Sequence, residues 1–206
     1  DATCEGGGNN GTATVTLTGG NSQAPGTYSL DGGAAVPYVT NPFTESATFD
    51  FKLFEKHVKI AQRLMDDLIE LELEKIDAIL SKIELDPEPD YIKYAEKQLW
   101  LNIKEKCING RRTGLGITAE GDMLAALGIR YGTNEGNEFS NKVHQILKIA
   151  AYSASVDMAK DRGSFPIYNS EREENNPFIQ RIKEEDPDLY SKMCKYGRRN
   201  IALLTI

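Results

Sequence analysis

The feature that most constrains this chain is an apolar stripe of helical period that begins near Phe49. Charged residues separate its members, as in a helix that packs one face on a core. Thr48 is a predicted N-cap, and the prolines of residues 86–89 (DPEP) end the helix because proline removes a backbone donor. The stripe consists of Phe54, Val58, Ala61, Met65, Leu68, Ile76, Leu80 and Ile83. It predicts one long helix over residues 49–85.

The rest of the chain after this helix alternates further helical patterns with two short apolar runs. Helices are predicted at residues 90–109 with Gly110 as C-cap, from Glu120 to near Gly128, at 138–162, and around 178–183 and 187–196. Short strands are predicted at 114–118 and 201–206, where apolar runs have strand length. These elements predict a helix-rich α/β fold.

The first predicted strand carries a Gly-x-Gly at Gly114 and Gly116, a spacing that also occurs in phosphate-binding loops. The third glycine of a dinucleotide fingerprint is missing, since the next one is Gly121. Glu120 and Asp122 lie where the next helix begins, so they favour the helix dipole but oppose an anion. We therefore interpret the glycines as a close packing contact at a strand-to-helix junction.

Residues 1–35 differ in composition from everything that follows. They contain no Lys or Arg and are rich in Gly, Thr, Asn and Ser. Thr14, Thr16 and Thr18 alternate with apolar residues, which predicts a strand, and residues 26–33 predict a second one between turn residues. About 35 residues do not bury a core alone. We predict a short β-prone tail at 1–35 and a separate domain at 36–206.

Charge and composition exclude several classes of function. The 206 residues carry a net charge of −7, which gives no support for nucleic-acid binding, and no apolar run is long enough to span a membrane. Cys4, Cys107 and Cys194 are far apart in the sequence, which favours a reduced, cytoplasmic protein. His57 and His144 each stand alone on a predicted helix. We assign no metal, catalytic or cofactor-binding residue from these patterns.

Several blocks in one order resemble the catalytic (large) subunit of ribonucleotide reductase, and most closely its adenosylcobalamin-dependent, class II form. The blocks are residues 38–44 (YVTNPFT), 61–67 (AQRLMDD), 110–118 (GRRTGLGIT) with 121–122, 154–166 and 196–206 (YGRRNIALLTI). Together they cover about residues 38–206. The resemblance implies part of a ten-stranded α/β barrel, to which 114–118 and 201–206 contribute strands.

The resemblance also implies an activity, a cofactor and partners. Members reduce ribonucleotides to deoxyribonucleotides for DNA synthesis, using a cysteine thiyl radical, a redox-active cysteine pair and a thioredoxin-like thiol reductant. The implied cofactor is adenosylcobalamin, and the full-length protein is a possible homodimer. The resemblance does not say whether the substrate is a diphosphate or a triphosphate.

This sequence departs from the family pattern at the active site. The family's radical cysteine lies in an Asn-x-Cys-x-Glu loop upstream of the block at 38–44, and no such motif occurs here. The family continues from Leu-Thr-Ile into Ala-Pro-Thr-Gly-Ser, which binds the substrate phosphates, whereas this sequence stops at Ile206. We expect a fragment that is inactive alone and binds no cofactor, with Cys107 and Cys194 in structural roles.

Arg198, Arg199 and Asn200, which precede the last predicted strand, are the residues nearest to a site. Ion pairs and caps at the edge of the domain are an equally good interpretation of them. Two other functions remain open. The tail at 1–35 resembles a bacterial adhesin-type β repeat, so the chain is alternatively a non-catalytic surface-protein fusion. The helix at 49–85 is alternatively a helical interaction module.

Overall fold

The computed structural model describes residues 2–5, 12–15, 27–28, 36–37 and 48–205. The chain divides into two compact units, Asp1–Thr48 and Phe49–Ile206. In the first unit, β1 (Ala2–Glu5) pairs antiparallel with β2 (Thr12–Val15), and β3 (Thr27–Tyr28) pairs with β4 (Val36–Pro37). The predicted strand positions 16–18 and the block at 38–44 lie outside the described residues.

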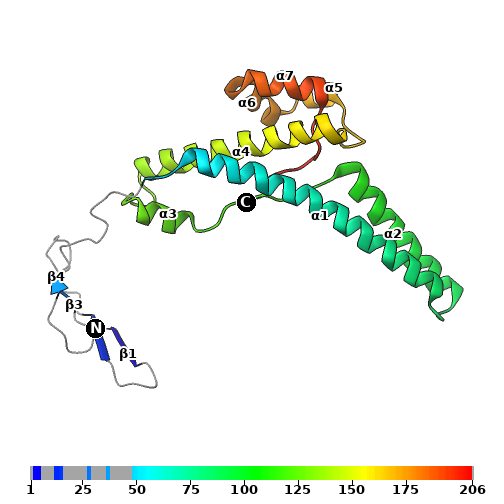
Figure 1. Ribbon diagram of the computed structural model, residues 1–206, viewed down its shortest axis with the longest axis horizontal. Coiled ribbons are helices and arrows are strands. Elements are labelled where there is room, and N and C mark those ends of the chain that lie inside the picture. The colour runs from blue at the N-terminus through cyan, green and yellow to red at the C-terminus, as the bar shows by residue number, and fades with distance from the viewer. Residues whose placement is uncertain (1, 6–11, 16–26, 29–35, 38–47, 206) are drawn as a thin grey trace. The chain divides into compact units, whose positions relative to one another are not determined.

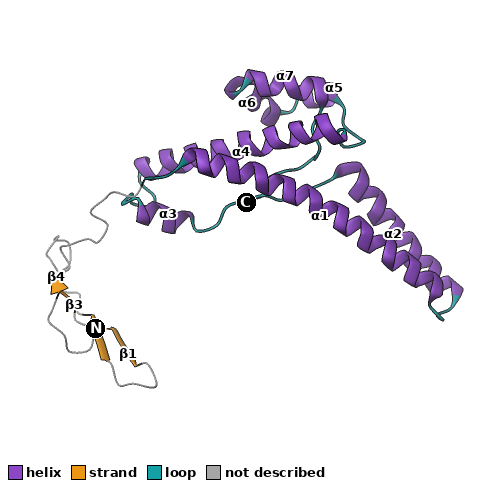
Figure 2. Ribbon diagram, viewed as in Figure 1, coloured by secondary structure: helices purple, strands orange, loops and turns teal. Residues whose placement is uncertain are grey.

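The second unit is built from seven described helices, of which α1 is the longest (Figures 1 and 2). They are α1 (Phe51–Leu85), α2 (Asp90–Gly110), α3 (Glu120–Ala126), α4 (Asn134–Arg162), α5 (Ser170–Glu174), α6 (Pro177–Glu185) and α7 (Pro187–Tyr196). The first half of α1 lies along α4, and α2 runs back along its second half. α6 and α7 pack on each other, and α7 also packs on α4.

Local chemistry explains where these helices begin. The carboxylate of Asp50 accepts from Leu53 N–H at the start of α1, and Thr133 accepts from Gly136 N–H at the start of α4. Pro177 and Pro187 begin α6 and α7, where a missing N–H costs nothing. The N-cap of α1 is therefore Asp50, two residues later than the predicted Thr48.

The hydrophobic core lies where α4 meets α1, α6 and α7. It is closed from one side by Leu203 of the C-terminal segment, which is 1% exposed. The central members of this core are Val58, Leu147, Ala150, Ala151, Val156, Ile179, Ile182, Leu189, Met193 and Leu203. Ala150, Ala151 and Ala154 are buried on α4, and their small side chains let its neighbours approach closely.

The expected α/β barrel was a wrong prediction. The described residues contain no barrel, and they contain no strand at 114–118 or 201–205. The two segments do run side by side and parallel, with one bridge between Leu115 and Leu204. Four backbone hydrogen bonds of 2.8–3.0 Å join residues 110–115 to residues 201–205. Parallel strands are stable as members of a larger sheet covered on both faces, and no third segment pairs with these two in the part of the chain described.

The glycine interpretation is confirmed at this contact. A Cβ on Gly116 would lie 3.1 Å from the carbonyl oxygen of Thr205, and one on Gly114 would lie 3.5 Å from Thr205 Cβ. Glu120 and Asp122 fall in the first turn of α3, as predicted, although no side chain caps that helix. Residues 114–116 are therefore a packing surface for the C-terminal segment.

We predict that Ile182→Ala lowers the free energy of unfolding by about 2–5 kcal/mol, since Ile182 is fully buried and the change leaves a cavity. Urea denaturation followed by circular dichroism measures this loss. Ile167→Ala is the matched control, because Ile167 is 54% exposed, and it is expected to change stability by less than about 0.5 kcal/mol. Equal losses in the two variants would show that the core is placed wrongly.

Candidate functional site

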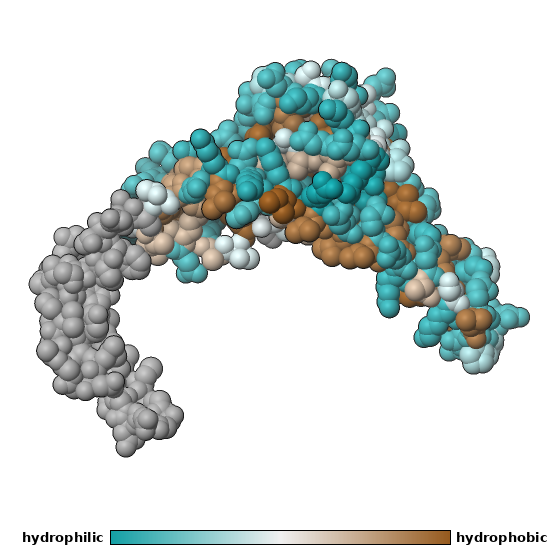
Figure 3. Space-filling view, in the orientation of Figure 1, coloured by the Kyte–Doolittle hydropathy of each residue, from teal (hydrophilic) through white to brown (hydrophobic). Residues whose placement is uncertain are grey.

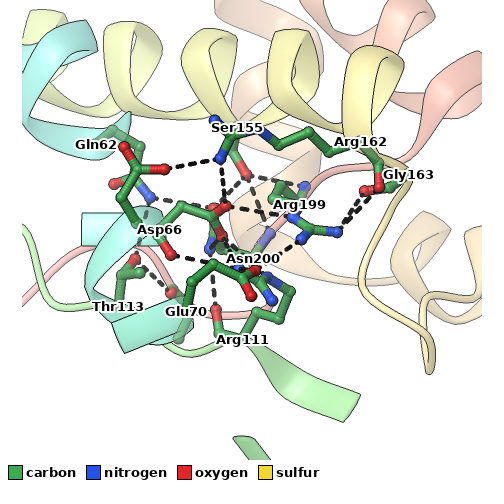
Figure 4. Close-up of polar contacts among 12 residues, drawn as sticks. Gln62, Asp66, Glu70, Arg111, Thr113, Ser155, Arg162, Gly163, Arg199 and Asn200 are labelled. Atoms are coloured by element: carbon green, nitrogen blue, oxygen red, sulfur yellow. Dashed lines mark hydrogen bonds and ion pairs between the residues drawn. The ribbon is translucent and has the colours of Figure 1, made fainter. Parts of the chain in front are cut away.

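Most of the buried polar residues in the described ranges lie at the middle of α1, where α4, the end of α2 and the C-terminal segment meet (Figure 4). We call this group the Asp66 cluster. It consists of Gln62, Asp66, Glu70, Arg111, Thr113, Ser155, Arg162, Arg199 and Asn200. Gln62, Asp66 and Glu70 follow one another at four-residue spacing, so they share one side of α1.

Asp66 is the member whose burial costs the most free energy, because its carboxylate is charged and its side chain is 0% exposed. Its Oδ1 accepts from Arg111 Nε and from Asn200 Nδ2, each at 3.0 Å. Its Oδ2 lies 3.3 Å from Arg199 Nε and 3.4 Å from Arg162 Nη1. Burial of a carboxylate is tolerated only with such partners, and Asp66 has four.

Two further carboxylates balance the charge of the three arginines. Glu70 Oε1 lies 2.7 Å from Arg111 Nη2 and 3.3 Å from Arg199 Nη2. Asp67 accepts from Arg162 Nη1 at 2.8 Å. Three acidic and three basic side chains therefore form a closed network with no net formal charge.

Asn200 joins the helices to the C-terminal segment and uses its whole amide to do so. Its Oδ1 accepts from Ser155 Oγ at 2.9 Å and from Gln62 Nε2 at 3.2 Å. Its Nδ2 donates to Asp66 and, at 3.1 Å, to the carbonyl of Arg111. A fully satisfied buried amide of this kind fixes the position of the backbone that carries it.

Arg111 adopts a left-handed backbone conformation, with φ 45° and ψ 55°, and it caps α2 in place of the predicted Gly110. This conformation is costly for a residue with a Cβ. The guanidinium contacts with Asp66 and Glu70 hold it there. Gly110 is buried beside Ile201, so it serves packing and leaves the cap to its neighbour.

Arg198 points away from the Asp66 cluster, as expected for adjacent residues in an extended segment. It is 3% exposed, and its guanidinium pairs with Glu173 at 2.8 Å and lies over the rings of Phe165 and Tyr152. Burial of Tyr152 raises the pKa of its hydroxyl, and the nearby charge of Arg198 opposes this rise. Ion pairing is thus confirmed for Arg198 and Arg199.

The Asp66 cluster contains no vacant ligand position. Its charged groups are paired, and the one buried side-chain atom of the cluster without a partner is the neutral Gln62 Oε1. Within the described ranges, no three His, Cys, Asp or Glu side chains gather as metal ligands do. We therefore assign the cluster a positioning role, fixing residues 198–205 against residues 110–115.

The cysteines lie elsewhere. Cys107 on α2 lines a cavity of about 400 Å³ with Glu72, Ile103 and Arg112, and burial raises the pKa of its thiol. A raised pKa reduces the thiolate fraction and so opposes nucleophilic chemistry at this thiol. Cys194 is exposed on α7, and the side chain of Cys4 lies outside the described residues.

A second cavity of about 390 Å³ lies among α4, α6 and the C-terminal segment. Its lining includes His144, Lys148 and Arg181 as well as Glu185, which pairs with Lys148 at 2.6 Å. The helices that surround both cavities are too short or too polar to cross a membrane, as is every helix in the described ranges.

We predict that Asp66→Asn destabilises the fold by about 3–5 kcal/mol, because Arg111 and Arg199 lose the charge that compensates them in a buried position. The neighbouring Asp67→Asn is the matched control. The Asp67 side chain is 45% exposed, so its loss is expected to cost about 1 kcal/mol or less. Urea midpoints of the two variants measure the difference, and a harmless Asp66→Asn would refute the positioning role.

Residues 34–206 match the family model for the ribonucleotide reductase barrel domain. A vitamin B12-dependent ribonucleoside-diphosphate reductase of Mycobacterium tuberculosis is 28% identical over 116 residues, which are 56% of this chain and 16% of the relative. The ribonucleoside-diphosphate reductase subunit alpha of Chlamydia pneumoniae is 27% identical over 122 residues, which are 50% of this chain and 12% of the relative.

The chain therefore spans less than a fifth of the length of these curated relatives. The family match includes every member of the Asp66 cluster. Since the match covers most of the sequence, this chain belongs to the ribonucleotide reductase barrel-domain family.

Proposed function

We propose that this chain is part of the catalytic subunit of a ribonucleotide reductase, which reduces ribonucleotides to deoxyribonucleotides by thiyl-radical chemistry. The observation that carries the proposal is the family match over residues 34–206. It leaves residues 1–33 for a surface-protein repeat, so the match disfavours the adhesin-type alternative. It begins close to the predicted boundary between a tail at 1–35 and a domain at 36–206, and it supports that division.

Within such an enzyme, the role that we propose for the described residues is positional. The Asp66 cluster fixes Asn200, and the backbone hydrogen bonds between residues 110–115 and 201–205 then fix the segment that ends at Thr205. In the family pattern this segment leads into the loop that binds the substrate phosphates. A displacement at Asn200 would therefore be passed to the substrate. The catalytic cysteines belong to other parts of the enzyme.

The proposed cofactor of the whole enzyme is adenosylcobalamin, which the name of the Mycobacterium tuberculosis relatives supports. The described residues do not fit it. The cavities of about 400 and 390 Å³ described above are at the lower end of the volumes that hold drug-sized ligands, and a corrinoid with its nucleotide tail is larger. We derive no reaction step through the cofactor from these residues.

The remaining parts of the proposal concern the enzyme's environment. The substrate class is a ribonucleoside diphosphate, the form that the relatives' names give. The electrons come from a thioredoxin-like dithiol, and the enzyme works in the cytoplasm, where its thiols stay reduced. The net charge of −7 gives no support for nucleic-acid binding.

We predict that residues 49–205 can replace the corresponding stretch of the Mycobacterium tuberculosis relative without abolishing its activity. The measurement is deoxyribonucleotide formation from a ribonucleoside diphosphate, with adenosylcobalamin and a dithiol present. We expect turnover above that of the same enzyme with the stretch deleted, and no turnover without adenosylcobalamin.

Two controls give this experiment its meaning. The chimaera with Asp66→Asn is expected to lose most of its activity, and the chimaera with Asp67→Asn is expected to keep it. Circular dichroism and thermal unfolding separate misfolding from a loss of function. A chimaera that folds like the parent enzyme but forms no product would contradict the proposed function.

A further inference from the structure

The side chain of Arg198 holds the backbone of the C-terminal segment on the side away from the Asp66 cluster. Its Nε donates to the carbonyl of Asn200 at 3.0 Å, and its Nη2 donates to the carbonyl of Ile201 at 3.1 Å. Arg198 is 3% exposed, so these two bonds form away from water. The segment is thus held at the point where its pairing with residues 110–115 begins.

Glu173 provides the counter-charge that lets Arg198 stay buried there. Its Oε2 lies 2.8 Å from Nη1 of Arg198, and its Oε1 accepts from Nη2 at 3.0 Å. The Glu173 side chain is 17% exposed, so the pair is largely desolvated. The rings of Phe165 and Tyr152 lie 5.4 and 5.8 Å from the guanidinium carbon. An arginine in such a place is stable only with its carboxylate partner.

Glu173 belongs to α5, a helix of five polar residues (SEREE) none of which is buried. Figure 3 shows mainly hydrophilic surface over α5, α6 and α7. Apolar packing therefore does not hold α5 in place, and polar contacts do. Gln180 of α6 donates to the carbonyl of Glu174, and the ion pair of Glu173 joins α5 to the C-terminal segment.

The loop between α4 and α5 fixes the start of the same segment. The N–H of Phe165 donates to the carbonyl of Arg198 at 3.1 Å. Gly197 has a φ of 72°, and a Cβ at this position would lie 2.7 Å from Ser164 Cβ. This close approach fixes the main chain of Arg198, while Glu173 fixes its side chain.

We propose that Glu173 is a positioning residue, which acts through the guanidinium of Arg198 on the carbonyls of Asn200 and Ile201. Without the charge of Glu173, the guanidinium would have no counter-charge in its buried position. It would then move to water and release both carbonyls. The segment that ends at Thr205 would be held by the Asp66 cluster on one side and by nothing comparable on the other.

The consequence for catalysis rests on the proposed function, in which this segment leads to the substrate phosphates. A shifted segment weakens the binding of the substrate in the ground state and in the transition state alike. Such a change raises KM and leaves kcat nearly unchanged. A loss of folded enzyme has the opposite signature, because it lowers the measured kcat and leaves KM as it was.

Amide hydrogen exchange in the whole chain tests the positioning role without any assay of activity. In Glu173→Gln, the amides of Ile201 and Thr205, which donate to residues 110 and 115, are expected to exchange about tenfold faster or more. The amide of Leu147 in the core reports general stability and should change much less. Glu174→Gln is the matched control, since Glu174 is exposed, and it should leave all three amides unchanged.

Two further variants test whether Glu173 acts through Arg198. Glu173→Asp keeps the charge on a shorter side chain, so its exchange rates should lie between those of the original chain and of Glu173→Gln. In a background of Arg198→Met, Glu173→Gln should add no further acceleration, because residues that act as one pair are not additive.

The chimaera described above tests the consequence for the reaction. Glu173→Gln is expected to raise KM for the ribonucleoside diphosphate by about tenfold while kcat stays within about threefold. Glu174→Gln should change neither. If the chimaera without these substitutions is inactive, the proposed function fails, and hydrogen exchange in the chain still decides the role of Glu173.

Three results would overturn the proposal. Unchanged exchange at Ile201 and Thr205 in Glu173→Gln would show that the Asp66 cluster holds the segment alone. Equal acceleration at Leu147 would show that the ion pair serves general stability. A lower kcat with unchanged KM in the chimaera would rule out an effect on the position of the substrate.

Discussion

The structure depends on the burial of one carboxylate. Asp66 lies at the centre of α1 with no exposed surface, and such a group is stable only when donors reach it from several sides. Those donors come from three other places, namely the end of α2, the end of α4 and the C-terminal segment. The hydrogen bonds and ion pairs that stabilise buried Asp66 therefore bring together four segments that are distant in sequence.

The sequence blocks that carry the family resemblance are largely the segments that surround Asp66. Four of the five sequence blocks that carry the resemblance each contribute to the Asp66 cluster, through Asp66, Arg111, Ser155 and Asn200. The fifth, at 38–44, lies outside the described residues. The blocks thus encode a scaffold that fixes the chain at Asn200.

The sequence predicted the helices well and their inward faces less well. The ends of α2, α4 and α7 fall within a few residues of their predicted positions, because Gly110, Gly163 and the flanking prolines are strong local signals. The periodicity of α1 placed Leu68 on the buried face, but Leu68 is 54% exposed and Ile69 is buried. A helix with two apolar faces gives two solutions, and periodicity alone does not choose between them.

The site was harder to predict than the helices. Gln62 and Asp66 lie on the buried face of α1, but a polar residue in an apolar stripe is usually taken as a surface position. Their spacing of four residues was the available signal. The expected barrel was wrong because it came from the family's architecture, whereas residues 114–118 and 201–205 form one bridge and no sheet.

The second half of α1 and most of α2 pack chiefly on each other and not on the hydrophobic core. Beyond the Asp66 cluster these two helices pack on each other, with Lys97 paired to Glu84 and Lys104 paired to Asp77 (Figure 1). They form an arm whose root is fixed by Asp66 and Arg111 and whose tip is the turn at 86–89. Because the arm's contacts are made within itself, matched turns can be added to both helices or removed from them during evolution while the root stays as it is.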